Sequence, residues 1–127
     1  MQYLVCFMLA AAGIVHLLPL SGVLGSEQLA SLYGMSVADP NLAILMRHRA
    51  VLFGLIGSFL LYAAFKPALR SIAFLGAIIS VASFLALAAT TGNYNAQINR
   101  VFLIDVVLLA GLVLGALGHV HMLRKAG

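Results

Sequence analysis

Four long apolar runs dominate the pattern of residues along the chain, at about residues 3–20, 42–65, 68–90 and 99–123. Each run has the roughly 20 residues that a helix needs to cross the hydrocarbon core of a membrane. Helix is required because backbone groups that face lipid must bond within their own segment. The regular alternation of apolar and polar residues that a membrane β-barrel needs is absent from the sequence. The pattern therefore predicts an all-α bundle of four transmembrane helices.

The first link between these runs is long and has helix signals of its own. Ser26 is a residue type favoured at a helix N-cap, and Gly34 is a type favoured just beyond a helix end. We expect a short interfacial helix in this first extramembrane loop, with Leu29, Leu32 and Tyr33 toward lipid or toward the bundle.

The other boundaries are marked by proline and by polar residues. Asp39-Pro40 is typical of an N-cap followed by proline in the first helical turn. Lys66-Pro67 breaks the second long helix, and a polar segment at 91–99 separates the last two runs. No internal repeat or linker is present, so residues 1–127 are expected to form one integral membrane domain.

Composition supports the membrane interpretation and excludes several classes of protein. The chain has 127 residues, of which 64% are hydrophobic and 8% are charged, whereas soluble chains average about 25% charged residues. A soluble domain this small has too little interior to bury so much apolar surface. The single cysteine, Cys6, allows neither an internal disulfide nor a multi-thiolate metal site. The cations are too few for a nucleic-acid surface, so lipid is the expected surrounding and no nucleic-acid partner is expected.

The placement of the cations predicts an orientation. With four spans both termini share one side of the membrane, and that side carries four cations against three on the other. The four are Lys66, Arg70, Arg124 and Lys125, and the three are Arg47, Arg49 and Arg100. If Arg47 and Arg49 lie within their helix, the ratio becomes four to one. The expectation is a bacterial inner membrane protein with both termini in the cytoplasm. The first run is expected to be retained as a helix, because no Lys or Arg precedes it as in a signal peptide.

Polar residues on three of the runs fall at one depth. At about 1.5 Å per helical residue, Arg47 lies ~27 Å from Phe65, Asp105 lies ~27 Å from Leu123, and His16 lies ~22 Å from Met1. These distances reach the outer part of a hydrocarbon core that is roughly 30 Å thick. We therefore expect one polar layer near the outer edge, made of His16, Arg47, His48, Arg49 and Asp105, with Arg100 just above it.

The faces of the helices suggest which of these residues point inward. Arg47 continues a row of small residues, Ala50, Gly54 and Gly57, and such rows let transmembrane helices approach closely. Arg47 is therefore expected to point into the bundle, together with His16 and Asp105. We also expect a contact between Asp105 and an arginine. An ionisable residue inside a membrane costs at least a few kcal/mol unless it is paired, so it is a functional candidate.

The candidate ligand-binding residues are His16, Arg47, His48, Arg49, Arg100 and Asp105. The segment 47–49 lies near a helix N-terminus, where cations are unfavourable unless a negative group approaches. The alternatives are an Asp105–Arg47 pair that only fixes helix packing, and His48 and Arg49 side chains that reach lipid headgroups.

No metal site is expected from the remaining histidines. His119 and His121 are two positions apart and point in different directions on a helix, so they cannot share one metal. They are more typical of residues that meet headgroups.

Several motifs resemble a known family. They are Leu32-Tyr33-Gly34, then Asp39-Pro40, and Met46-Arg47-His48-Arg49-Ala50 running into Leu52-Phe53-Gly54. With four short spans, they resemble the DoxX-like superfamily of small four-helix membrane proteins over nearly the whole chain. Relatives of this kind sometimes carry the label phosphopantetheine adenylyltransferase, for which this sequence has no nucleotide-binding pattern. The resemblance implies a link to thiol or thiosulfate redox chemistry with quinones, although Cys6 alone cannot form a dithiol.

Three functions are compatible with the sequence. The first is an outer-leaflet polar pocket for a quinone-like or amphipathic anionic ligand, in a small membrane-embedded binding protein or an oxidoreductase-associated subunit. The second is a membrane enzyme in which Asp105 and His16 act as acid and base on a lipid-like substrate. The third is a structural or assembly subunit that contacts a membrane-protein partner or a second copy of itself. The sequence names no cofactor.

Overall fold

The computed structural model describes residues 1–126 and contains only helices and turns over this range. Its five α-helices are α1 (Gln2–Leu17), α2 (Ser26–Tyr33), α3 (Pro40–Ala64), α4 (Arg70–Thr91) and α5 (Ala96–Ala126), with 3-10 turns η1 (Leu18–Leu24) and η2 (Pro67–Leu69). Four helical segments are long and apolar enough to cross a membrane: Gln2–Leu24, Pro40–Ala64, Pro67–Thr91 and Ala96–Ala126. The prediction of an all-helical chain with four helices of spanning length is confirmed.

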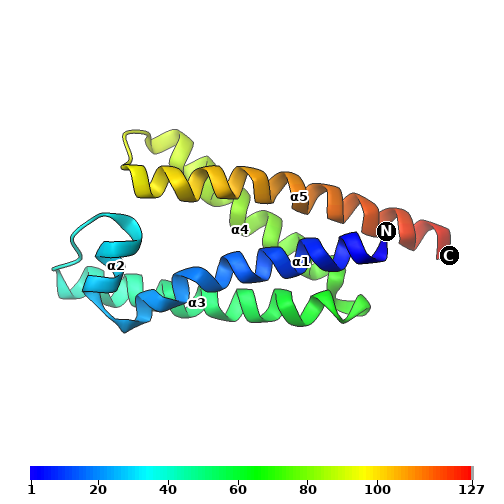
Figure 1. Ribbon diagram of the computed structural model, residues 1–127, viewed down its shortest axis with the longest axis horizontal. Coiled ribbons are helices and arrows are strands. Elements are labelled where there is room, and N and C mark those ends of the chain that lie inside the picture. The colour runs from blue at the N-terminus through cyan, green and yellow to red at the C-terminus, as the bar shows by residue number, and fades with distance from the viewer. Residues whose placement is uncertain (127) are drawn as a thin grey trace.

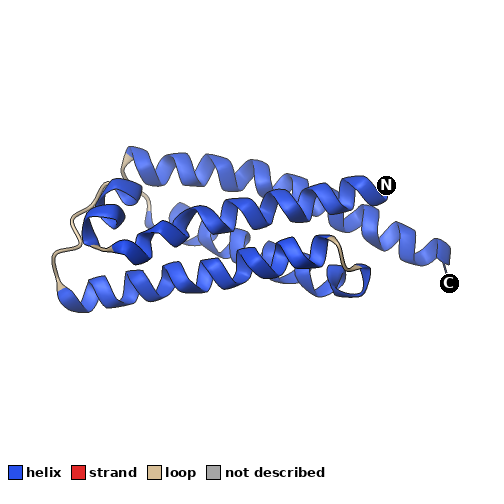
Figure 2. Cartoon of the chain, turned by 60° about the horizontal axis from the view of Figure 1, so that its bottom comes forward, coloured by secondary structure: helices blue, strands red, loops and turns tan. Residues whose placement is uncertain are grey.

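The long helices run alternately up and down the bundle (Figure 1). Both termini and the turn between α3 and α4 lie at one end, which we call the terminal end. Helix α2 and the turn between α4 and α5 lie at the other, which we call the α2 end. Figure 2 shows α5 extending beyond the other helices at the terminal end. Helix α1 packs mainly against α3 and α5, and α4 packs mainly against α5.

The first spanning segment changes its helix type near the α2 end. Its α-helix stops at Leu17, and the N–H of Leu18 donates to the carbonyl of Val15 in the shorter 3-10 pattern. Pro19 accounts for the change, because it has no N–H to donate and its ring crowds the preceding turn. The run continues as η1, so the segment predicted at 3–20 extends to Leu24.

A short helix does occur in the first link, but it begins differently from the expectation. Ser26 is its first helical residue and Gly25 is its N-cap, without any side-chain cap bond, so the prediction that Ser26 is the N-cap is wrong. The start moves because Gly25 adopts a backbone conformation that only glycine tolerates well, at φ 142°. Gly34 ends the helix in the left-handed conformation, at φ 64°, as predicted. Leu29 and Tyr33 are buried, so this face of α2 packs on the bundle.

Helix α3 begins as the sequence predicts. Asp39 is its N-cap, and its Oδ1 accepts hydrogen bonds from the backbone N–H of Asn41 at 2.7 Å and of Leu42 at 3.5 Å. Pro40 occupies the first helical position, where its missing N–H has no cost.

Helices α1 and α3 meet through glycines. A Cβ atom on Gly57 would lie 2.8 Å from the carbonyl oxygen of Gly13, and a Cβ on Gly13 would lie 2.9 Å from that of Gly57. Ala50, Gly54 and Gly57 are all buried along this contact. The predicted row of small residues is therefore the packing face of α3 toward the first spanning segment.

The terminal end differs from expectation at two residues. His119 is buried, at 6% exposed, and its Nε2 lies 3.0 Å from the Ser71 hydroxyl, so the prediction that it meets headgroups is wrong. The reason is that α5 packs against the start of α4 at this level, whereas His121 is exposed. Arg70 is also buried and donates from Nη2 to the carbonyl of Ala64 at 2.8 Å. Arg70 therefore provides a hydrogen-bond donor to a carbonyl at the C-terminal end of α3 and is not a surface cation.

Candidate ligand-binding site

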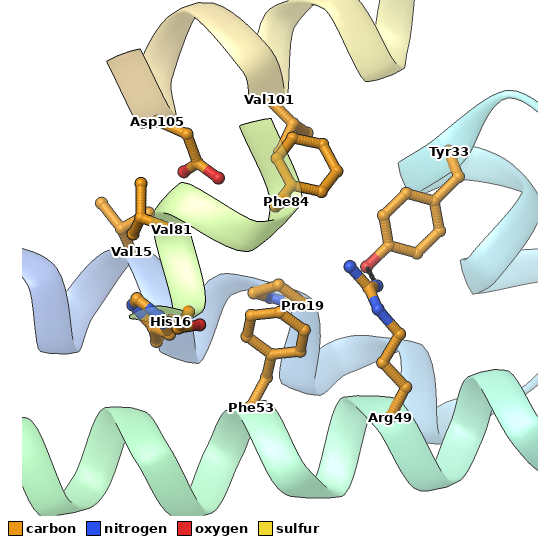
Figure 3. A pocket seen from close by; sticks show the side chains of 11 residues that line it. Val15, His16, Pro19, Tyr33, Arg49, Phe53, Val81, Phe84, Val101 and Asp105 are labelled. Carbon is orange, nitrogen blue, oxygen red and sulfur yellow. Dashed lines mark hydrogen bonds between the residues drawn. The ribbon is translucent and has the colours of Figure 1, made fainter. Parts of the chain in front are cut away.

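A small cavity of about 60 Å³ lies toward the α2 end, and all four spanning segments and α2 contribute to its walls (Figure 3). Its lining residues are Val15, His16, Pro19, Tyr33, Arg49, Phe53, Ser80, Val81, Phe84, Val101 and Asp105. Its walls are mostly apolar, with an acid, a cation, a histidine and two hydroxyl groups among them.

Asp105 is the acidic group of the cavity. It lies on the inward face of α5, in line with the buried Leu108 and Leu112, and its own side chain is 9% exposed. Its carboxylate points into the cavity in Figure 3. Within the described residues 1–126, Asp105 makes no hydrogen bond and no ion pair. The carboxylate is therefore open to the cavity, where a hydrogen-bond donor on a ligand would stabilise it.

His16 is held in one orientation by two neighbours. Its Nδ1 lies 2.8 Å from the carbonyl of Ala12, and its Nε2 lies 3.0 Å from the hydroxyl oxygen of Ser80. Because a carbonyl only accepts, Nδ1 carries the hydrogen, and Nε2 of the neutral ring accepts from Ser80. This contact joins α1 to α4 on one wall of the cavity.

Arg49 supplies the positive charge. Its Nη1 donates to the hydroxyl oxygen of Tyr33 at 2.7 Å. Its Cζ lies 4.6 Å from the ring centroid of Phe53 and 5.3 Å from that of Tyr33. Aromatic faces stabilise a guanidinium by cation–π attraction, and only one of its donors forms a hydrogen bond within residues 1–126. The guanidinium is thus fixed at the cavity with donors to spare.

Arg49 and Asp105 carry opposite charges at one cavity without touching. No nitrogen–oxygen distance between them falls within ion-pair range in the part of the chain that the structure describes. The expected direct Asp105–arginine contact is therefore wrong, because the two charges lie on different walls.

Three of the predicted residues do not line the cavity: Arg47, His48 and Arg100 are all exposed. The prediction that Arg47 points into the bundle is wrong. Its backbone does continue the small-residue row, but η1 occupies the space beside α3 at this level, and Arg47 Nε donates to the carbonyl of Val23 at 2.9 Å. Arg49 instead shares its helix face with Phe53, one turn further on, and that face meets the cavity.

Sequence reasoning missed two polar residues of the cavity. Ser80 had a signal, since it and Ser83 are the only hydroxyl residues within the apolar stretch 72–89, and polar residues in spans tend to face other helices. Tyr33 was expected only to lie on the face of the short helix that meets lipid or the bundle. Its role depends on the fold of the first link, where Asn95 Nδ2 donates to the Tyr33 carbonyl at 2.7 Å.

A more open groove adjoins the cavity between α3 and α4. It has a volume of about 340 Å³ and shares Arg49, Phe53, Ser80 and Phe84 with the cavity. Its other lining residues are Leu52, Ile56, Ser83 and Leu87. The polar cavity and the apolar groove on the outside of the bundle are thus neighbours that share these side chains as a common wall.

Metal binding has no support in the geometry. No group of three or more His, Cys, Asp or Glu side chains in residues 1–126 is arranged to hold a metal ion.

The fold and the site together define a class. An all-helical bundle with four helices of spanning length, large apolar side chains exposed along all four, and a small polar cavity inside is a helical membrane protein. No family model, no curated protein and no solved structure matches this chain.

Proposed function

We propose that this protein binds the polar head of an amphipathic membrane molecule in the cavity between Asp105 and Arg49. The observation that carries the proposal is the buried carboxylate of Asp105, which faces the cavity without a protein partner while Arg49 faces the same space. A ligand that forms hydrogen bonds with both groups offsets the free-energy cost of keeping their charges away from water without partners.

Energetics favour this function over a purely structural cluster. A buried ion pair that fixes helix packing needs close contact, because only good geometry offsets the loss of solvation of both charges. Asp105 and Arg49 lack that contact, and Arg47 bonds elsewhere.

The size of the cavity limits the ligand. A cavity that holds a benzene ring has about 150 Å³, whereas this cavity has about 60 Å³. A small head such as a hydroxyl, amine, amide or carboxylate fits the space as it stands. A quinone ring, which the likeness to DoxX-like proteins implies, requires Phe53 or Phe84 to move. If the ligand is a quinone, the proposal also includes membership of that superfamily and a role as an oxidoreductase-associated subunit.

The proposed setting is a bacterial inner membrane, with the α2 end toward the outer leaflet. In this placement α2 lies at the membrane interface, with Glu27 and Ser31 exposed and Leu29 and Tyr33 packed on the bundle. The cavity then lies just inside the outer edge of the hydrocarbon core.

A second candidate function, acid–base catalysis on a lipid-like substrate, is favoured by one contact. His16 Nε2 lies 3.0 Å from the Ser80 hydroxyl, at the distance from which a base can take a proton. With p-nitrophenyl laurate as the substrate, this function predicts turnover by the wild type and its loss in His16→Gln. A protein that only binds its ligand gives no turnover in either form.

The test of the binding proposal is Asp105→Asn. The amide keeps the shape but removes the charge, so native mass spectrometry should show the loss of a ligand that co-purifies with the wild type. The free energy of unfolding should change by less than about 1 kcal/mol, because no hydrogen bond or ion pair within the protein is lost.

Glu27→Gln is the matched control, since Glu27 is exposed and remote from the cavity. It should retain the ligand and the stability of the wild type. A fall of about 3–5 kcal/mol in Asp105→Asn, the cost of an uncompensated buried charge, would identify a structural ion pair and contradict the proposal.

A further inference from the structure

We infer that the cavity is filled sideways from the membrane, by a single-chain amphipath whose apolar chain lies in the groove between α3 and α4. This inference rests on the proposed function and names the route and the chemical class of the ligand. It is supported by the common wall of groove and cavity, by the chemistry of their linings, and by the size of the cavity.

The common wall is the first support. Arg49, Phe53, Ser80 and Phe84 line both the cavity and the groove, so movement of the Phe53 or Phe84 side chain is enough to join the two spaces. Figure 3 shows Phe53 and Phe84 beside the cavity, on α3 and α4 respectively. Helices α3 and α4 also pack on each other less closely than α1 packs on α3 or α4 on α5. The bundle is thus most loosely packed between α3 and α4, which is where the groove lies.

The walls of the groove define the chain of the ligand. Leu52, Ile56 and Leu87 line only the groove and belong to spanning helices. In a bilayer this surface is covered by hydrocarbon. An amphipath that is anchored by its head in the cavity places its own chain there, in preference to a free lipid tail, because head and chain are one molecule.

The cavity defines the head. The Asp105 carboxylate accepts hydrogen bonds, whereas the Arg49 guanidinium donates them. The Tyr33 oxygen accepts from Arg49, which leaves the Tyr33 hydroxyl hydrogen free to donate as well. A head that satisfies both walls carries a donor toward Asp105 and an acceptor toward Arg49. It must also be small, because the cavity has only about 60 Å³. A fatty-acyl amide with a hydroxyl end meets these requirements, because its terminal hydroxyl both donates and accepts and only this end has to enter the cavity.

The absence of tryptophan from the sequence allows a direct test. The full chain, in nanodiscs of ordinary phospholipid, carries one introduced reporter: Leu87→Trp or Leu52→Trp in the groove. The matched control is Ala110→Trp, in an apolar groove between α4 and α5 that shares no residue with the cavity. The probe is lauroyl ethanolamide with a brominated chain, since bromine quenches tryptophan fluorescence on contact. The control probe is the brominated lauroyl methyl ester, which has no hydrogen-bond donor.

The inference predicts saturable quenching of both groove reporters by the ethanolamide. The control reporter should be quenched only in proportion to the probe dissolved in the bilayer. Asp105→Asn should weaken the saturable binding by about tenfold or more, as expected for the loss of a hydrogen bond to a charged group. The methyl ester should bind at least about tenfold more weakly than the ethanolamide for the same reason.

Other outcomes separate this inference from the proposed function. If native mass spectrometry shows Asp105-dependent binding of the ethanolamide but all three reporters are quenched alike, the route is wrong and the binding site remains. If the ethanolamide does not bind while the co-purified ligand still depends on Asp105, the ligand class is wrong. If no binding of any kind depends on Asp105, both the inference and the proposed function are wrong.

Discussion

At the scale of single residues, two arginines that are two positions apart have different roles. Arg47 bonds to the carbonyl of Val23 in η1, away from the cavity, whereas Arg49 lies between Phe53 and Tyr33 at the cavity. Two positions rotate a helical side chain by about 200°, so the two guanidinium groups leave α3 on nearly opposite sides. The pair provides a variant and a control with the same chemical change.

Arg49→Gln should lower the fraction of protein that carries the co-purified ligand by about tenfold or more, because a hydrogen bond to a charged group is lost. Arg47→Gln should leave that fraction unchanged. Native mass spectrometry of the two variants beside the wild type measures both effects. Equal loss in both variants would show that general positive charge, and not the Arg49 position, holds the ligand.

The two serines in the middle of α4 also differ. Ser80 joins α4 to His16 on α1, whereas Ser83 donates to the Ser80 carbonyl of its own helix at 3.0 Å. Ser80→Ala should lower the free energy of unfolding by about 1 kcal/mol, since a buried histidine nitrogen loses its donor. Ser83→Ala should change it little. Thermal unfolding in one detergent compares them, and equal stabilities would mean that the contact between helices contributes nothing.

At the scale of helices, the contact between α1 and α3 depends on glycine. Gly13 and Gly57 bring the two backbones so close that a Cβ on either would overlap a carbonyl oxygen of the other helix. On α1, His16 lies three residues beyond Gly13. On α3, Phe53 lies one turn before Gly57. Close packing here therefore sets the spacing of two walls of the cavity.

Gly57→Ala should destabilise the protein by about 1–3 kcal/mol, because the added methyl group meets backbone that cannot rotate away. Gly76→Ala is the control, since a Cβ at Gly76 in the middle of α4 would have no neighbour within 4 Å. This change should be neutral or slightly stabilising. Unfolding by heat, followed by circular dichroism, distinguishes the two, and a stable Gly57→Ala would contradict the close contact.

Helix α2 connects the turn before α5 to the cavity. Tyr33 contacts Arg49 through its hydroxyl, and its backbone carbonyl accepts from Asn95 in the turn before α5. The same Asn95 accepts from the N–H of Ile98 through Oδ1, at the start of α5. These bonds connect α2, α3 and α5 above the cavity, so the first link is part of the site and not a free loop.

At the scale of the whole molecule, the exposed cations give a modest charge bias between the two ends. Lys66, Arg124 and Lys125 are exposed at the terminal end, while Arg47 and Arg100 are exposed toward the α2 end. The burial of Arg70 removes one cation from the count on the terminal side. The proposed orientation, with the terminal end in the cytoplasm, rests on this remaining bias.

Labelling of introduced cysteines tests this orientation. In a Cys6→Ala background, Ser36→Cys should react with a membrane-impermeant maleimide in intact cells, because Ser36 is exposed at the α2 end. Lys66→Cys, exposed at the other end, should react only after the cells are opened. The reverse pattern would place the termini and the Lys66 turn outside.

The sequence by itself determined the four spanning segments, because the length and apolarity of each run are local properties. It also determined that His16 and Asp105 share one level, since the constant rise of a helix converts residue numbers into depth. Both residues line the same cavity in the folded chain. The cap at Asp39 and the stop at Gly34 were predictable for the same reason, because each depends on a few adjacent residues.

Only the tertiary structure decided which cation faces Asp105. Rotation about a helix axis and the reach of a long arginine side chain depend on what lies beside the helix, and η1 fills that place at the level of Arg47. The positions of Tyr33 and Ser80 were decided in the same way, by the packing of α2 and α4 against helices distant in sequence. Depth follows from counting along one helix, whereas the facing of side chains is a property of the whole bundle.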